Sequence, residues 1–219
     1  MPSLDRSKLR FILVTDRQAA VRPIEEVVSA ALEAGFTAVQ LREKALPAAE
    51  LYKLACKLRE LTTRHEALLI VNDRVDVALA AGADAAQLGW QSLDVPAARA
   101  VAQDRLALGV SAHNVVEMRQ AMRHRANFVL FGPVFRTPSK EGLVEPTGVE
   151  LLQAMAIPAS MPVIAIGGID KTNIAQVMAT RAGGIAVIRA VVAAADPFEA
   201  ARELIAAAEA APKRPAAAK

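Results

Sequence analysis

Apolar residues along the chain gather into eight short runs. The runs are RFILVT (10–15), TAVQLR (37–42), ALLIVN (67–72), AAQLG (85–89), LALGVS (106–111), FVLFG (128–132), PVIAIGG (162–168) and GIAVIR (184–189). They are rich in Val, Ile and Leu and too short for independent helices, which is typical of parallel strands that are buried on both faces. The pattern therefore predicts eight buried strands.

The intervals between these runs carry the spacing of amphipathic helices. PIEEVVSAALEAG ends on Gly35, a favourable residue just beyond a helix, and PAAELYKLACKLRELTTRH follows the second run. The later intervals hold VDVALAAG, VPAARAVAQ, VVEMRQAMRHR, GVELLQAMA, TNIAQVMAT and PFEAARELIAAAEAA. Eight alternations of strand and helix over about 200 residues predict a single-domain α/β fold, the (β/α)8 TIM barrel.

A doubly wound open sheet is the alternative arrangement of the same elements. At this length it usually has fewer strands, and it carries a glycine-rich phosphate fingerprint after the first strand. The segment FILVTDRQAAVRP contains no such fingerprint. We predict one barrel over residues 10–211, a loose N-terminal lead-in over residues 1–9 and a disordered tail over residues 212–219.

Composition and charge limit the partners and the cellular compartment that we expect for the protein. The net charge is +3, and the tail supplies Lys213, Arg214 and Lys219, so the predicted barrel is nearly neutral. No run of Lys and Arg interleaved with aromatics suggests nucleic acid, and no apolar stretch reaches the ~18 residues of a membrane span. The start is polar, unlike a signal peptide, and the one cysteine, Cys56, cannot form an internal disulfide. We expect a cytoplasmic protein with neither nucleic acid nor membrane as partner, and homo-oligomerisation stays open.

Polar residues follow most of the predicted strands, where a barrel places its chemistry. They are Thr15, Asp16 and Arg17, then Gln40, Arg42 and Lys44, then Asn72, Asp73 and Arg74, then Trp90, Gln91 and Ser92, then Ser111, His113 and Asn114, then Thr137, Ser139 and Lys140, and finally Arg189. Because the carboxyl ends of all eight strands meet at one end of a barrel, we expect these side chains to surround one site.

Two anion sites are predicted there. Gly167 and Gly168, with the end of the eighth strand, form the usual phosphate site of a barrel. The cations Arg42, Lys44 and Lys140 form the second. The carboxylate of Asp73 among them suggests a Mg²⁺ ion that bridges to phosphate oxygens.

Simpler interpretations exist for each feature alone. The glycine pair could form a tight turn, Arg42, Glu43 and Lys44 a solvated ion-pair cluster, and Asp73 the N-cap of the next helix. His113 could be a polar loop residue, and Cys56 a small core residue. Trp90 could either pack at the barrel mouth or cover a flat ring.

The motifs FILVTD, QLREK, IVNDR, GVSAHN, FGPVFRTPSK and VIAIGGI, in this order and spacing, resemble the thiamine phosphate synthases. The resemblance covers residues 10–208. Thiazole tautomerases belong to the same superfamily and are the related alternative.

The resemblance implies a transferase that joins hydroxymethylpyrimidine diphosphate to thiazole phosphate and releases pyrophosphate. The bond to pyrophosphate breaks first and leaves a cation stabilised by the pyrimidine, which the thiazole nitrogen attacks. Such a reaction requires positioning and neutralisation of the leaving group.

The resemblance also implies roles for individual residues. The residues implied to be catalytic are Lys140, Ser111 and Arg42. Those implied to hold the pyrimidine diphosphate are Gln40, Arg42, Lys44, Asn72, Ser111 and Lys140. Thr137, Ser139, Gly168, Ile188 and Arg189 are implied to hold the thiazole phosphate, and Asp73 the Mg²⁺ ion.

The fourth predicted strand departs from the synthase pattern, which typically reads H-x-G-Q-x-D there. Gln87 stands at the histidine position, Trp90 at the glutamine position and Ser92 at the aspartate position, which is the second metal ligand. Asp94 follows two residues later. Elsewhere, Pro133 stands where the tautomerases place a working histidine, and Arg189 stands where a serine is common. A tautomerase and a non-catalytic binder of thiamine-precursor phosphates therefore stay as alternatives.

Overall fold

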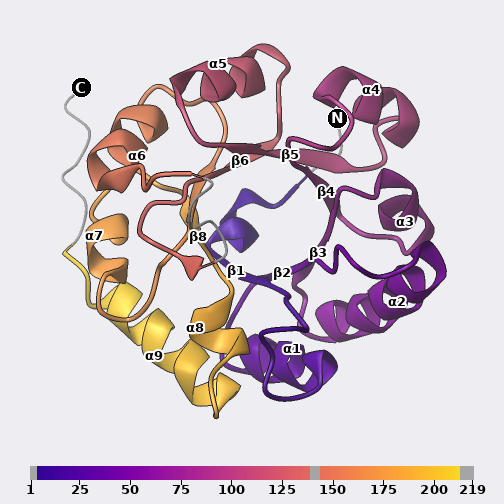
Figure 1. Cartoon of the computed structure of the whole chain (residues 1–219), viewed down its shortest axis with the longest axis horizontal. Coiled ribbons are helices and arrows are strands. Elements are labelled where there is room, and N and C mark those ends of the chain that lie inside the picture. Colours follow the sequence, from indigo (N-terminus) through magenta and orange to yellow (C-terminus); the bar gives the residue numbers. More distant parts are fainter. Residues whose placement is uncertain (1–3, 139–143, 213–219) are drawn as a thin grey trace.

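The computed structural model describes residues 4–138 and 144–212, which form a closed barrel of eight parallel strands. The strands are β1 (Phe11–Val14), β2 (Ala38–Leu41), β3 (Leu68–Asn72), β4 (Ala85–Leu88), β5 (Ala107–Ala112), β6 (Phe128–Phe131), β7 (Val163–Ile166) and β8 (Gly184–Val187). Each pairs with the next along the chain, and β8 pairs with β1, with Leu13 opposite Val187. The strands form the inner ring in Figure 1. The TIM barrel prediction is confirmed, and the open sheet is excluded.

Helices form the outer ring in chain order (Figure 1). They are α1 (Ile24–Glu33), α2 (Ala48–Arg64), α3 (Val75–Ala80), α4 (Val95–Ala102), α5 (Val115–Arg123), α6 (Gly148–Ala156), α7 (Ile174–Met178), α8 (Arg189–Val192) and α9 (Pro197–Glu209). The side chains of Asp94, Asn114 and Asp196 cap α4, α5 and α9 by accepting backbone N–H bonds. Contacts of α9 with α1 and α7 close the ring.

The observed strands are mostly shorter than the predicted runs. The run 162–168, for example, contributes only Val163–Ile166, because its glycines leave the sheet and enter a loop. The strand β5 instead extends one residue beyond the prediction, to Ala112.

The core has two layers. The larger layer lies between the strands and the helices, and Cys56 packs against it while partly buried. The smaller layer fills the barrel interior with side chains that include Ile12, Ile70 and Phe128. Gly109 is required here, because a Cβ at this position would lie 2.2 Å from the Phe128 ring. Side chains therefore fill the barrel interior, and a functional site is expected at one of its ends.

The N-terminal segment closes the bottom of the barrel. Residues Arg6–Leu9 form a 3₁₀ helix, η1, which Asp5 caps by accepting the N–H of Ser7, and Leu9 is fully buried in the interior layer. This corrects the expectation of a loose lead-in for residues 6–9, because Leu9 gains burial from the barrel. The tail predicted over residues 212–219 lies outside the described residues except for Pro212.

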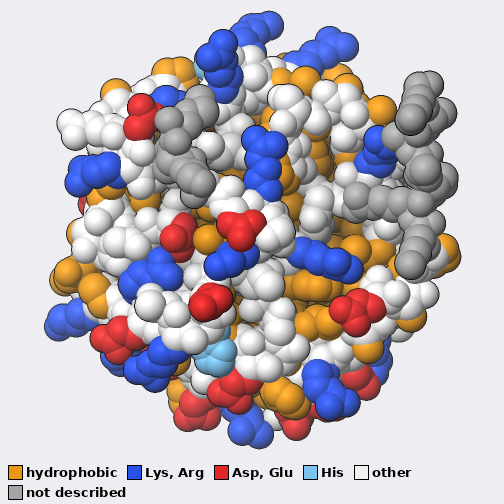
Figure 2. All heavy atoms as spheres, turned by 180° about the vertical axis from the view of Figure 1, so that it is seen from behind, with side chains coloured by type: hydrophobic (Ala, Val, Ile, Leu, Met, Phe, Trp, Pro, Cys, Tyr) orange, Lys and Arg blue, Asp and Glu red, His pale blue; other side chains and the backbone are white. Residues whose placement is uncertain are grey.

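Two surface properties bear on possible partners. In the described part of the chain no helix is long and apolar enough to cross a membrane. Figure 2 shows the side of the molecule that faces away from the viewer in Figure 1, where positively and negatively charged side chains are interspersed rather than separated by sign.

Candidate active site

A cavity of about 610 Å³ lies at the carboxyl ends of the strands. The predicted site residues that line it are Gln40, Arg42, Lys44, Asn72, Asp73, Ser111, Thr137, Gly168, Ile188 and Arg189. They come from the ends of six different strands or from the loops that follow them, so the barrel brings together residues that are far apart in the sequence. Ser139 and Lys140 lie outside the described residues.

The loop after β2 presents two cations to the cavity. The backbone N–H of Arg42 donates to the buried Thr15 hydroxyl at 2.9 Å, which anchors the start of this loop to β1. Neither Arg42 nor Lys44 takes part in any of the ion pairs found among residues 4–138 and 144–212. The ion-pair-cluster interpretation is therefore wrong for the described structure. Both charges are available to an anion.

Glu43 lies between these two cations in the sequence, but its carboxylate bonds to a different loop. Its carboxylate accepts the backbone N–H of Arg17 at 3.1 and 3.2 Å, across the neighbouring loop after β1. Partial burial raises the pKa of Glu43 above its ordinary value, against the opposing effect of bonds from Thr15 and Arg17. Glu43 therefore joins two loops rather than neutralising Arg42 or Lys44.

A chain of side-chain amides orients Asp73. The Gln40 Nε2 group donates to Asn72 Oδ1 at 3.3 Å, and Asn72 Nδ2 donates to Asp73 Oδ2 at 2.7 Å. Gln40 is almost fully buried at the barrel top. The carboxylate of Asp73 is therefore held in place from the β2 side of the cavity.

The capping role considered for Asp73 is wrong. The helix α3 has Arg74 at its N-cap position and no side-chain capping bond. Asp73 itself has a φ of 61°, in the left-handed region. Its Oδ1 accepts the hydroxyl of Ser92 and the N–H of Gly89, the latter at 3.4 Å. The carboxylate thus points toward the loop after β4.

That loop begins with a tight turn over residues 89–92. The N–H of Ser92 donates to the Gly89 carbonyl at 3.1 Å, and the N–H of Gly89 donates to Ser92 Oγ at 2.6 Å. Asp94 caps α4 by accepting the N–H of Ala97 at 2.8 Å. The loop after β4 therefore offers Asp73 the hydroxyl of Ser92, while Asp94 is engaged at the start of a helix.

Ser111 and Gln87 form a pair at the ends of β5 and β4. Gln87 is only 1% exposed, and its Nε2 donates to Ser111 Oγ at 3.1 Å. Gln87 Oε1 has no hydrogen-bond partner within the described structure. Since the Ser111 oxygen already accepts a bond, its own proton is free to be donated into the cavity.

His113 lies in the loop after β5 and also lines the cavity. Its Nδ1 is 2.9 Å from Glu117 Oε2, one turn into α5. Burial alone would raise the pKa of Glu117, but the hydrogen bonds from His113 and Asn114 outweigh it and lower this pKa. His65 and His124 instead occupy the C-caps of α2 and α5.

The opposite wall is built by Gly167 and Gly168, which have φ values of 100° and 65°. A Cβ on Gly168 would lie 2.3 Å from the Arg136 carbonyl oxygen, and one on Gly167 would lie 2.5 Å from Pro133 Cα. The Gly167 carbonyl accepts the N–H of Phe135 at 3.0 Å. These glycines form a tight turn that packs against the loop after β6, and they line the cavity as well. The tight-turn interpretation is confirmed, and the phosphate site stays a prediction.

Sequence reasoning missed two charged residues of the lining, Arg136 and Asp170. Arg136 stands inside the FGPVFRTPSK motif, next to Thr137, so its position in the motif was an available signal. Asp170 lies three residues before Asn173, the N-cap of α7, and its carboxylate accepts bonds from the backbone N–H and the hydroxyl of Thr172. Trp90, whose role the sequence left open, lines the cavity and is 79% exposed.

Comparison with known proteins shows which family the chain resembles over most of its length. The thiamine monophosphate synthase family matches residues 11–191. A thiamine-phosphate synthase of Moorella thermoacetica is 43% identical over 89% of this chain and 92% of its own length. A thiamine-phosphate synthase of Archaeoglobus fulgidus is 43% identical over 90% of this chain and 92% of its own length.

A solved structure extends the similarity to three dimensions. The thiamine phosphate pyrophosphorylase of Pyrococcus furiosus superposes with a TM-score of 0.86 at 39% identity, over 93% of this chain and 97% of the other. The match thus spans the barrel and the cavity together. The chain belongs to the thiamine monophosphate synthase family.

Proposed function

We propose that the cavity is the active site of a transferase of thiamine biosynthesis, a thiamine phosphate synthase. It joins hydroxymethylpyrimidine diphosphate to thiazole phosphate and releases pyrophosphate. The observation that carries the proposal is the cavity itself, with unpaired cations and an oriented carboxylate on one wall and a glycine turn on the other. A protein of this kind works in the cytoplasm on small phosphorylated substrates.

The wall after β2, β3 and β5 is suited to the diphosphate. Arg42 and Lys44 are free to neutralise the charge that develops on pyrophosphate as it leaves, and such neutralisation is usually the largest single contribution to catalysis. The Ser111 hydroxyl has a proton to donate to the same leaving group. Lys140 is the third cation of this set in the sequence-based prediction.

The wall after β6, β7 and β8 is suited to the phosphate of the second substrate. Gly168, Thr137, Ile188 and Arg189 line it, and the loops after the last two strands are the usual phosphate site of this fold. The two walls face one cavity, so both substrates can be held with their reacting atoms close together.

Mg²⁺ fits the described residues as an ion shared with the diphosphate. Asp73 is the oriented carboxylate, and its Oδ1 accepts a hydroxyl from Ser92 where the synthase pattern has a second carboxylate. No group of three or more His, Cys, Asp or Glu side chains suited to a metal occurs in the described part of the chain. Mg²⁺ commonly binds one or two carboxylates together with substrate phosphates and waters. The ion would neutralise diphosphate charge beside Asp73.

The tautomerase alternative has less support at this site. The residue at the position of the tautomerase histidine is Pro133, which lines the cavity without a titratable group. The family relatives described above carry the name of the synthase.

The test is an assay of pyrophosphate release with purified protein. We expect release that requires both substrates and Mg²⁺, with thiamine phosphate identified by mass spectrometry. Release from the pyrimidine diphosphate alone would indicate a hydrolase. No release under any combination, with binding retained, would indicate the non-catalytic binder.

A further inference from the structure

Trp90 is the chain's only tryptophan, and its position is unusual for so large an apolar side chain. The described part of the chain exposes eight large hydrophobic residues, and Trp90, at 79%, is the most exposed. Of these eight, Trp90 alone lines the cavity. An indole left in water at the edge of a cavity lacks the apolar burial that it would gain against a flat ligand.

The backbone position of Trp90 is set by a hydrogen-bonded turn. Trp90 is the second residue of the tight turn 89–92, which the bond from the Ser92 N–H to the Gly89 carbonyl closes. The turn is attached to Asp73 through the Ser92 hydroxyl and the Gly89 N–H. The indole is therefore carried on a backbone that is tied to the carboxylate of the diphosphate wall.

We infer that Trp90 stacks on the aminopyrimidine ring of the diphosphate substrate and is a specificity-determining residue for this ring. This inference rests on the proposed function, which supplies the identity of the ring. Gly89 and Ser92, which belong to the same turn as Trp90, bond to Asp73, so we expect a ring attached to a diphosphate at Asp73 to lie within reach of the indole. Stacking of a heteroaromatic base on an aromatic side chain is a general means of binding such rings.

The assignment to the pyrimidine, rather than to the thiazole, follows from the layout of the cavity. The thiazole phosphate is assigned to the wall of Gly168 and Ile188, which comes from β7 and β8. Trp90 follows β4, which lies between β3, followed by Asp73, and β5, whose end carries Ser111. The ring bonded to the diphosphate is therefore the one within reach of the indole.

The first test uses the fluorescence of this single tryptophan. Hydroxymethylpyrimidine diphosphate and inorganic pyrophosphate are titrated separately into the protein with Mg²⁺, and the two changes in emission are compared. We expect the pyrimidine diphosphate to change the emission strongly and pyrophosphate to change it little, because only the first carries a ring. Equal changes with both ligands would overturn the inference.

The second test uses substitutions in the same loop. Trp90→Ala should weaken binding of the pyrimidine diphosphate about tenfold by calorimetry, which corresponds to about 1.4 kcal/mol, and Trp90→Phe should restore most of it. Binding of pyrophosphate should stay unchanged. Leu93→Ala is the matched control, because Leu93 is 50% exposed and does not line the cavity, and it should bind as the parent does.

Other results would give the indole a different role. Emission that changes with protein concentration, and not with ligand, would show that Trp90 contacts a second copy of the chain, which overturns the inference. If Trp90→Ala binds the pyrimidine diphosphate as tightly as the parent and still releases pyrophosphate, the stacking inference is overturned and the proposed synthase function stands. Ring-dependent emission without pyrophosphate release would instead uphold the stacking and contradict the proposed synthase.

Discussion

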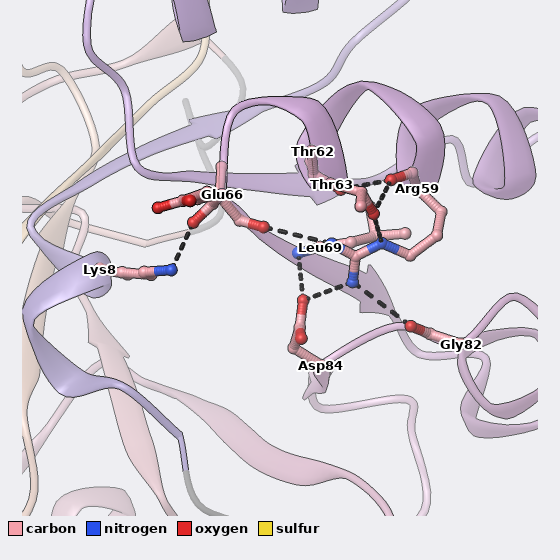
Figure 3. Close-up of polar contacts among 9 residues, drawn as sticks. Lys8, Arg59, Thr62, Thr63, Glu66, Leu69, Gly82 and Asp84 are labelled. Carbon is pink, nitrogen blue, oxygen red and sulfur yellow. Dashed lines mark hydrogen bonds and ion pairs between the residues drawn. The ribbon is translucent and has the colours of Figure 1, made fainter.

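Two arginines at opposite ends of the barrel differ in their partners. At the amino ends of β3 and β4, Arg59 donates to Asp84 Oδ2 at 2.7 Å, to Thr63 Oγ1 and to the carbonyls of Gly82 and Ala67 (Figure 3). Asp84 also accepts the N–H of Leu69 at 2.7 Å. Arg42, at the carboxyl end, lines the cavity and has no ion-pair partner in the described structure. The paired cluster joins elements of the fold, and the unpaired cation is left for a ligand.

This difference predicts how mutations should divide between activity and stability. A charge whose partners are all within the fold contributes to folding, and its removal is felt in the free energy of unfolding. A charge that lines a cavity without a partner contributes to binding and catalysis instead. Four substitutions test the division, beginning with the largest expected effect.

Arg42→Ala should reduce kcat/KM for pyrophosphate release by about 10²-fold or more, because it removes charge neutralisation at the leaving group. The melting temperature should change little, since Arg42 makes no ion pair in the described fold. Arg17→Ala is the matched control, an exposed cation at the neighbouring strand end that does not line the cavity. A large drop in melting temperature for Arg42→Ala, with activity retained, would place Arg42 with the structural charges.

Arg59→Met should show the reverse behaviour. It removes a charged donor from Asp84 and from two carbonyls, at a partly exposed site, so we expect unfolding to become easier by about 2 kcal/mol. For a domain of this size that corresponds to a fall of about 4–8 °C in melting temperature. Activity measured well below that temperature should stay close to the parent's.

Arg64→Met provides the control on the same helix. Arg64 is 69% exposed and contacts Glu60 at 3.8 Å, a type of surface pair that contributes little. Its melting temperature should match the parent's. If Arg59→Met and Arg64→Met have the same melting temperature, the Arg59 cluster does not stabilise the fold as its geometry suggests.

More of the fold than of the site could be predicted from the sequence. Eight apolar runs with helical intervals determine a barrel, because burial on both faces leaves a signal in every strand. Leu9 escaped notice, since one buried residue in a polar lead-in has no periodicity. Of the predicted cations and carboxylate, Arg42, Lys44 and Asp73 come soon after strands and do line the cavity, while Lys140 lies outside the described residues. Arg136 could have been predicted from its place in the FGPVFRTPSK motif, whereas the coupling of Ser92 to Asp73 depends on how two loops fold toward each other, which no local pattern encodes.

Ser92→Asp should sharpen the comparison by adding a second carboxylate to the carboxyl end. We expect it to strengthen Mg²⁺ binding in the absence of substrate about tenfold, because Mg²⁺ prefers charged oxygens. Without metal, repulsion between the new carboxylate and Asp73 should lower the melting temperature, and added Mg²⁺ should restore it. Ser92→Ala serves as the control and should give no metal-dependent recovery. An unchanged Mg²⁺ affinity for Ser92→Asp would indicate that the loop after β4 does not face the metal.

Gln87→Leu tests whether a buried amide that contacts no ligand can still contribute to catalysis. Gln87 does not line the cavity, and it acts on the site through Ser111, whose oxygen accepts its N–H. Loss of this bond lets the Ser111 hydroxyl rotate, and we expect kcat to fall about fivefold, the equivalent of one net hydrogen bond. The melting temperature should not fall, because Gln87 Oε1 is already buried without a partner in the described structure and an apolar group of similar size removes that cost.

A double-mutant cycle separates this positioning role from a general packing effect. In a Ser111→Ala background, Gln87→Leu should cost almost nothing further in kcat, because the hydroxyl that it orients is gone. Gln87→Glu gives an independent check. A carboxylate at this position accepts rather than donates, so it would turn the Ser111 proton away from the cavity and lower kcat more than leucine does. Additive losses in the cycle would show that Gln87 supports the barrel top as a whole and does not act through Ser111.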